Sequence, residues 1–110
     1  MITELRDAGH LDVLLGAAHP TWIFKHSNSC PTSAAAHDEV ETYLAAHPAE
    51  VLGMVVVQVD RPLSNLIAQR LARVHQSPQL FLIANGKVIW SASHWSITAA
   101  AMAAERARLA

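Results

Sequence analysis

Hydrophobic positions recur with a helical period in four segments of the chain. The first lies near residues 11–18, and the second runs from Pro31 to about residue 46. The third starts near Pro62, which suits the first turn of a helix, and continues to about residue 74. The fourth is expected from Ile97 to about Arg108, with Ser96 as its N-cap. The pattern therefore predicts four helices.

Four shorter segments between these helices are rich in β-branched and aromatic residues, which is typical of strands. They are "TWIFK" (21–25), "VLGMVVVQVD" (51–60), "QLFLIA" (79–84) and "KVIWS" (87–91). The second is apolar almost throughout, as in a strand that is covered on both faces and paired in parallel. Asn85-Gly86 separates the last two, and this dipeptide favours a type I′ hairpin turn.

The order of these elements is helix, strand, helix, strand, helix, hairpin, helix. A βαβ unit followed by a ββα unit predicts an α/β fold with a four-stranded mixed sheet flanked by helices, and the remaining helix is an extra N-terminal one. This is the thioredoxin-like arrangement. No repeat or Pro/Gly/Ser-rich linker divides the chain, so residues 1–110 are expected to form a single thioredoxin-like domain.

Composition narrows the classes of partner. Hydrophobic residues make up 52% of the chain, charged residues 15%, and the formal net charge is -1. The eight Lys and Arg are scattered, which disfavours a nucleic-acid partner. The longest apolar run falls far short of the ~20 residues that cross a bilayer, and "MITELRDAGH" does not resemble a signal peptide. We expect a cytoplasmic protein without a membrane partner, as a monomer or weak dimer.

The sequence contains one cysteine, Cys30, within "HSNSCPTS". One cysteine excludes an intrachain disulfide, so the thiol is a buried apolar group, a reactive group or an intermolecular partner. Its polar neighbours favour the reactive interpretation. Because Pro31 suits the first helical position, Cys30 is expected at the N-cap, where free N–H groups and the helix dipole favour a thiolate.

Several other residues are candidates to support this chemistry. Lys25 and His26 would stabilise a thiolate if their side chains turned toward the sulfur, and Ser29 and Ser33 would donate hydrogen bonds to it. Ser77-Pro78, just before the hairpin, is a candidate cis peptide whose backbone would pair with an extended substrate.

Two alternative sites have less support. His26 beside Cys30 is compatible with a hydrolytic Cys–His pair, although seven histidines in the chain make chance proximity common. A metal site built from His26, His37 or His94 lacks both a His-x3-His pair and an HExxH helix, so no metal is predicted.

Three stretches, "FKHSNSCPTS", "VHQSPQLFLIANGKVIW" and "SASHWSIT", resemble the YtxJ-like family, the monothiol bacilliredoxins of bacteria that use bacillithiol in place of glutathione. The resemblance extends from about Ile23 to Thr98. It implies a thioredoxin-like fold, Cys30 as the attacking thiol and Pro78 as a cis proline. Thr32 departs from the pattern, in which an aliphatic residue is expected.

Two positions distinguish the chain from dithiol thioredoxins. Ser33 stands where a dithiol enzyme has its second Cys, and a hydroxyl cannot attack sulfur. Phe24 stands where dithiol thioredoxins commonly bury an acid for proton transfer. Both differences argue against a general disulfide reductase.

The resemblance implies an enzyme that removes bacillithiol, or a similar low-molecular-weight thiol, from S-thiolated client proteins through a mixed disulfide on Cys30. No tightly bound cofactor is expected, and bacillithiol is the co-substrate. Two alternatives remain: a monothiol protein that shares an iron–sulfur cluster across a dimer, and a non-catalytic adaptor whose cysteine senses redox stress.

Overall fold

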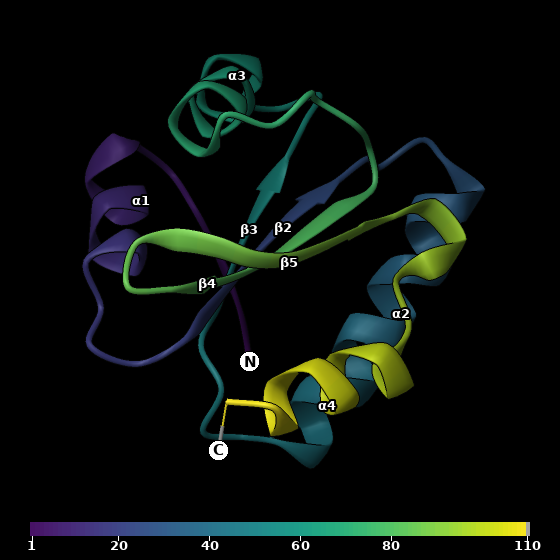
Figure 1. Ribbon diagram of the computed structural model, residues 1–110. Coiled ribbons are helices and arrows are strands. Elements are labelled where there is room, and N and C mark those ends of the chain that lie inside the picture. Colours follow the sequence, from purple (N-terminus) through teal and green to yellow (C-terminus); the bar gives the residue numbers. More distant parts are fainter. Residues whose placement is uncertain (110) are drawn as a thin grey trace.

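A five-stranded mixed sheet with helices on both faces organises the chain (Figure 1). The computed structural model describes residues 1–109. The strands are β1 (Ile2–Glu4), β2 (Thr21–His26), β3 (Leu52–Val56), β4 (Gln79–Ala84) and β5 (Lys87–Ser93). The helices are α1 (Ala8–Leu15), α2 (Pro31–Ala46), α3 (Arg61–Leu71) and α4 (Ala99–Ala107), with a short 3₁₀ helix, η1 (His94–Ser96), before α4.

The sheet has the order β1-β3-β2-β4-β5. Strands β1, β3 and β2 are parallel, β4 runs antiparallel to β2, and β5 runs antiparallel to β4. The predicted hairpin is confirmed, because Asn85 and Gly86 both have positive φ angles, 54° and 75°. The predicted βαβ and ββα units are therefore both present.

Strand β1 was not part of the predicted sheet. Ile2 pairs in parallel with Leu52 of β3, which adds a short fifth strand at the edge of the four predicted ones. A strand of three residues with a single apolar side chain is too short to show an alternating pattern in the sequence. Its strand conformation comes from pairing with β3 rather than from its own residues.

The helices differ from the sequence interpretation at several of their ends: α1 ends at Leu15 rather than near residue 18, α3 ends at Leu71 rather than near residue 74, and the N-cap of α4 was misplaced. Ser96 does not cap the last helix, because it belongs to η1; the N-cap is Thr98, whose side-chain oxygen accepts a hydrogen bond from the Ala101 N–H at 3.1 Å. Asp7 and Asp60 cap α1 and α3 in the same way.

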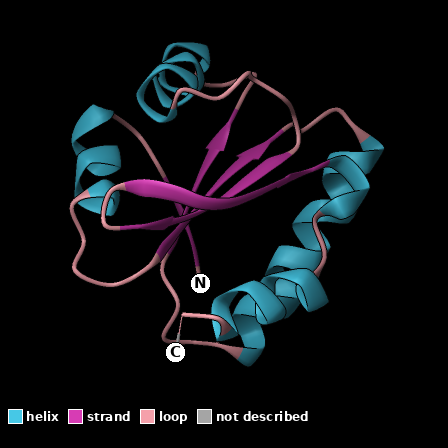
Figure 2. Ribbon diagram, viewed as in Figure 1, coloured by secondary structure: helices cyan, strands magenta, loops and turns pink. Residues whose placement is uncertain are grey.

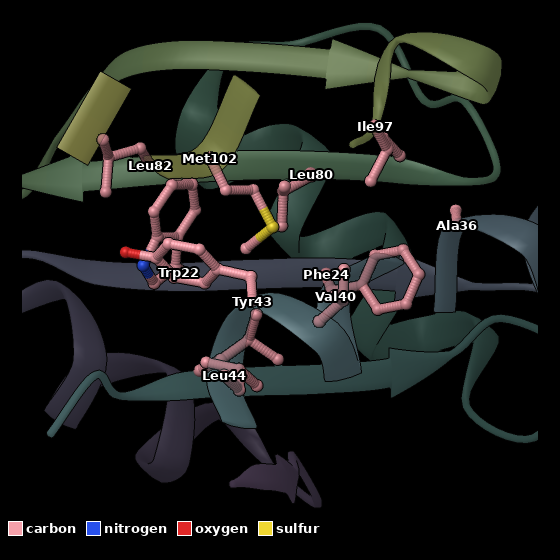
Figure 3. Packing of buried hydrophobic residues seen from close by; sticks show 11 residues of the cluster. Trp22, Phe24, Ala36, Val40, Tyr43, Leu44, Leu80, Leu82, Ile97 and Met102 are labelled. Atoms are coloured by element: carbon pink, nitrogen blue, oxygen red, sulfur yellow. The ribbon is translucent and has the colours of Figure 1, made fainter. Parts of the chain in front are cut away.

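Two hydrophobic cores lie on opposite faces of the sheet. One is formed with α2 and α4 and contains Trp22, Phe24 and Tyr43 (Figure 3). The other is formed with α1 and α3 and contains Ile23, Leu63 and Phe81. Successive residues of β2 alternate between the two cores, so all of this strand except its last residue is buried.

The topology brings several loops to one end of the sheet. The loop after β2, the loop after β3, the loop before β4 and η1 after β5 meet where the parallel strands end (Figure 2). Cross-strand pairs Lys25–Gln79 and Gln79–Ser93 align these loops side by side. No helix among residues 1–109 has the length and apolar character needed to span a membrane.

Candidate active site

Cys30 is the N-cap residue of α2, and Pro31 occupies the first turn, as predicted. The backbone of Cys30 is extended, with φ -114° and ψ 121°, so the helix begins directly after this residue. Cys30 is partly exposed, and its sulfur is free. The site therefore offers an accessible thiol at the positive end of a 16-residue helix.

The pKa of the Cys30 thiol is lowered from its ordinary value. The largest cause is hydrogen bonding from the backbone N–H of Ser33, which stabilises the thiolate; desolvation opposes it, and the N–H and hydroxyl of Thr32 add further stabilisation. The helix start thus activates the sulfur mainly with main-chain donors.

The hydroxyl of Ser33 is bonded to groups other than the Cys30 sulfur. Ser33 is fully buried, and its Oγ accepts a hydrogen bond from the Ser27 N–H at 2.8 Å and lies 2.9 Å from His26 Nδ1. Since Oγ accepts from Ser27, its proton is available to His26 Nδ1. Ser33 contributes its backbone N–H to the thiolate, whereas the expected contribution from its hydroxyl is not what the geometry gives.

The ring of His26 contacts the buried hydroxyl of Ser33 and the ring of His37. His37 belongs to α2, and the centroids of the two rings are 4.9 Å apart. Burial, followed by the neighbouring His37, lowers the pKa of His26, so its ring is neutral near pH 7 and adds no charge to the site. His37 also bonds to Glu41 at 2.9 Å on the surface of α2, and with Asp38 these side chains form an exposed polar group.

Lys25 does not turn toward the sulfur. Its side chain is fully buried, and Nζ lies 3.0 Å from Nδ1 of His75, which belongs to the loop before β4. Ile23, two residues earlier in β2, belongs to the core that α1 and α3 cover, which places Lys25 on that face. The expected direct support of the thiolate by Lys25 is therefore wrong in its geometry.

The loop that precedes Cys30 is organised by Gln58, from the segment after β3. Gln58 Nε2 donates to Ser27 Oγ at 2.6 Å and to Ser29 Oγ at 3.0 Å, and its Oε1 accepts from the Asn28 N–H at 3.2 Å. The side chain of Ser29 is thus part of the loop scaffold.

Ser77 and Pro78 lie at the same end of the sheet as Cys30. The peptide bond between them is cis, as expected, and Pro78 O accepts a hydrogen bond from the His94 N–H at 3.2 Å. Within residues 1–109, Ser77 Oγ is the one buried side-chain oxygen without a hydrogen-bond partner. This segment is fixed to η1 on one side and contains a buried hydroxyl without a partner.

A family model described as Monothiol bacilliredoxin BrxC matches residues 3–102. The match includes the cysteine loop, the Ser77-Pro78 segment and η1. The chain belongs to the monothiol bacilliredoxin family.

Solved structures agree on the fold of this bacilliredoxin. A protein with a thioredoxin fold is 28% identical, with 94% of this chain and 91% of that chain covered and a TM-score of 0.88. A thioredoxin mutant from Halobacterium salinarum (16% identity, 97% and 88% covered, TM-score 0.76) and the thioredoxin of Fasciola hepatica (15%, 96% and 97%, 0.76) share the fold. Together with its one cysteine, these matches make the chain a monothiol redox protein with a thioredoxin fold.

Three residues of the bacilliredoxin site were missed by the sequence interpretation. Thr32, noted only as a departure from the family pattern, supplies donors to the sulfur. Gln58 organises the cysteine loop. The one hint of this in the sequence is that Gln58 is a polar residue within the otherwise apolar run 51–59. His75 gives no such signal, since its partner Lys25 lies 50 residues away.

Proposed function

We propose that this protein removes bacillithiol from S-thiolated client proteins by a one-thiol exchange on Cys30. The observation that carries the proposal is the arrangement at the start of α2, in which an accessible, acidified sulfur stands alone. The residue one turn later, Ser33, is buried and has its hydroxyl bonded to Ser27 and His26. The second sulfur of each exchange therefore comes from solution.

The proposed exchange transfers a disulfide without net oxidation. The Cys30 thiolate attacks the bacillithiol sulfur of the client mixed disulfide, and a new S–S bond forms as the old one breaks. The client leaves as a thiolate and takes a proton from water. A low-molecular-weight thiolate then attacks the adduct, forms its own disulfide with bacillithiol and restores the Cys30 thiolate.

The donors at the helix start support both halves of this cycle. The N–H groups of Ser33 and Thr32 stabilise Cys30 as a thiolate, which raises the attacking fraction near neutral pH. The same donors make Cys30 a better leaving group when the second thiol attacks the adduct.

Exposed apolar side chains at the Cys30 end of the sheet favour a protein client. More than two-thirds of the surface is exposed at each of Val59 after β3, Val74 before β4 and Trp95 of η1, and all three segments lie at this end of the sheet. A client segment that covers them would gain hydrophobic contact beside the thiol. We propose that Ser77 and Pro78 bind this segment or the adduct, and that the protein acts in the cytoplasm.

The test uses a single-cysteine client that carries bacillithiol. Without added thiol, the wild type is expected to release client thiol equal in amount to its own Cys30 and then stop, whereas Cys30→Ser releases none. A glutathionylated client run in parallel measures the preference for bacillithiol. Equal release by the wild type and Cys30→Ser, or by neither, would contradict the proposal.

A further inference from the structure

The segment 74–76, which leads into Ser77 and Pro78, is fastened to the sheet by buried side chains. Gln79 of β4 is 6% exposed; its Nε2 donates to Val74 O at 3.2 Å, and its Oε1 accepts from the Gln76 N–H at 3.2 Å. Between these two anchors, the ring of His75 reaches Lys25 of the neighbouring strand. Three consecutive residues of the loop are thus held by two adjacent strands.

Lys25 and Gln79 are direct cross-strand partners, so their side chains lie on the same face of the sheet. This is the face covered by α3, whose buried Ser64 places its Oγ 3.5 Å from His75 Nδ1. Cys30 begins α2, which covers the opposite face. Lys25 is therefore placed to act on the loop before β4 and not on the sulfur.

In the pair formed by Lys25 and His75, the lysine is charged and the histidine ring is neutral. Nδ1 of a neutral His75 accepts a hydrogen bond from the Lys25 ammonium. Within residues 1–109, no carboxylate forms an ion pair with either side chain. The other charged group that acts on His75 is a further cation, Arg61 at the start of α3.

A buried ammonium without a carboxylate partner is costly, and desolvation lowers the pKa of Lys25 to about 8. A methionine would fill the same space without that cost. The position therefore carries a polar group at the expense of stability, as happens where function requires it.

We propose that Lys25 is a positioning residue for the exchange: through His75 it holds the 74–76 segment so that Ser77 and Pro78 are set to receive a client chain, and protonation of His75 releases this hold. The inference rests on the proposed thiol exchange, but it concerns the binding of the chain that carries the disulfide, whichever low-molecular-weight thiol is attached.

The pH dependence follows from the proton on Nδ1. Burial, then the charges of Lys25 and Arg61, lowers the pKa of His75, so the ring stays neutral until the pH falls below its ordinary range. A proton on Nδ1 removes the acceptor and sets two cations against each other. The hold is thus present near neutral pH and is lost in acid.

The experiment compares a chain substrate with a small probe. A peptide whose cysteine carries thionitrobenzoate reports exchange at Cys30 with a chain attached, and iodoacetamide reports the thiolate alone. Lys25→Met is expected to slow the peptide reaction about tenfold, mainly through KM, and to leave alkylation by iodoacetamide unchanged. Lys87→Met, at the sequence's other lysine, which is exposed on β5, is the matched control and leaves both rates unchanged.

Variants of His75, which is itself exposed, keep the test independent of core folding. His75→Asn retains an acceptor near the position of Nδ1 but does not titrate, so it should keep the peptide rate at pH 7.5. In acid its peptide rate should fall only as much as its iodoacetamide rate, which follows the Cys30 thiolate, whereas the wild-type peptide rate should fall further. His75→Ala should slow the peptide reaction at pH 7.5 and match the wild type in acid, where the wild type has already lost the contact between Lys25 and His75.

Two results would overturn the inference. One is a Lys25→Met variant that slows iodoacetamide as much as the peptide, which would mean that Lys25 supports the thiolate itself. The other is a His75→Ala variant that reacts with the peptide like the wild type at pH 7.5. Normal exchange with the peptide but none with a bacillithiolated client would instead refute the proposed function and leave the positioning role established by the variants.

Discussion

The two ends of the sheet differ in how many partners their inward-facing polar groups have. At the end where β3 begins, the Glu50 carboxylate accepts hydrogen bonds from Trp22 Nε1 (3.0 Å), Tyr43 OH (2.7 Å) and Arg106 Nε (3.1 Å). At the Cys30 end, a buried ammonium has a neutral histidine as its partner, and the hydroxyl of Ser77 has none. The first end thus holds a charge with three hydrogen-bond partners, and the second holds a buried ammonium without a carboxylate and a buried hydroxyl without a partner.

The pKa directions express the same difference. Burial raises the pKa of Glu50, but the hydrogen bonds from Trp22, Tyr43 and Arg106 bring it below its usual value, so the folded state favours the charged form. Burial lowers the pKa of Lys25, so the folded state disfavours its charged form. One charge stabilises the fold, while the other costs stability next to the proposed binding loop.

The largest effect is expected from Glu50→Ala. It leaves two buried donors and an arginine without a partner, and should lower the free energy of unfolding by about 3 kcal/mol. Urea denaturation at pH 7 measures this loss. Glu4→Ala, which removes only the exposed ion pair with Arg6, is the control and should cost less than about 0.5 kcal/mol.

Glu50→Ala should leave the alkylation rate of Cys30 unchanged, because the two sites lie at opposite ends of the sheet. A variant that loses thiol reactivity along with stability would show that the two ends are coupled. The stabilising contribution of Glu50 itself should disappear as the pH falls through its lowered pKa, since the unfolded chain binds that proton first.

Ser33→Ala tests whether the hydroxyl after Cys30 serves the fold or the thiol. Removing it leaves the Ser27 N–H and the His26 ring without a partner, and the expected loss is about 1–2 kcal/mol of unfolding free energy. The acidity of Cys30 should change little, because the donor from this residue is its backbone N–H. Ser96→Ala, at an exposed serine, is the control; a large rise in the Cys30 pKa in Ser33→Ala would refute the assignment.

Lys25→Met is expected to have the opposite sign and to stabilise the fold by about 1–2 kcal/mol at pH 7. The folded-state pKa is lowered from 10.5 to about 8, so between these values the folded protein releases a proton that the unfolded chain retains. The wild type therefore gains stability as the pH rises through this range, and the advantage of Lys25→Met shrinks. Parallel denaturation curves at pH 7 and pH 10 measure this; a destabilised variant at pH 7 would contradict it.

Thr32→Val should have the smallest effect, and it should change only the acidity of the Cys30 thiol. It removes the hydroxyl donor to Cys30 and keeps the backbone N–H, so the thiol pKa rises and alkylation near neutral pH slows by a few-fold. The ultraviolet absorbance of the thiolate, followed against pH, measures the shift. Thr42→Val, later on the same helix, removes a hydroxyl that bonds only to Asp38 O and should leave the titration unchanged.

The sequence was a good guide to structure determined by local pattern. The hairpin turn at Asn85-Gly86, a buried strand within the segment 51–60 and the position of Cys30 before Pro31 each follow from residue types within a few positions. The strand itself is shorter than expected and ends at Val56. Strand β1 and the cap of α4 were missed or misplaced, because a three-residue edge strand and a 3₁₀ turn take their form from the neighbouring elements.

The sequence predicted the position of the reactive sulfur, but not the contacts made by the residues around it. Proximity in sequence suggested that Lys25 faces the thiol. Because side chains alternate in β2, Lys25 instead lies on the opposite face of the sheet from α2 and contacts His75. Gln58 reaches the cysteine loop from the turn that follows β3, 31 residues along the chain from its partner Ser27. Contacts across 30 or 50 residues depend on the register of the sheet, which local patterns do not contain.

Intact mass of the protein after one exchange tests the central claim most directly. The wild type is mixed with an equal amount of bacillithiolated client, the reaction is quenched with acid, and both masses are measured. The account predicts one bacillithiol on Cys30 and the same amount of free client thiol. An unmodified protein beside an intact client disulfide, or a disulfide between Cys30 and the client itself, would contradict it.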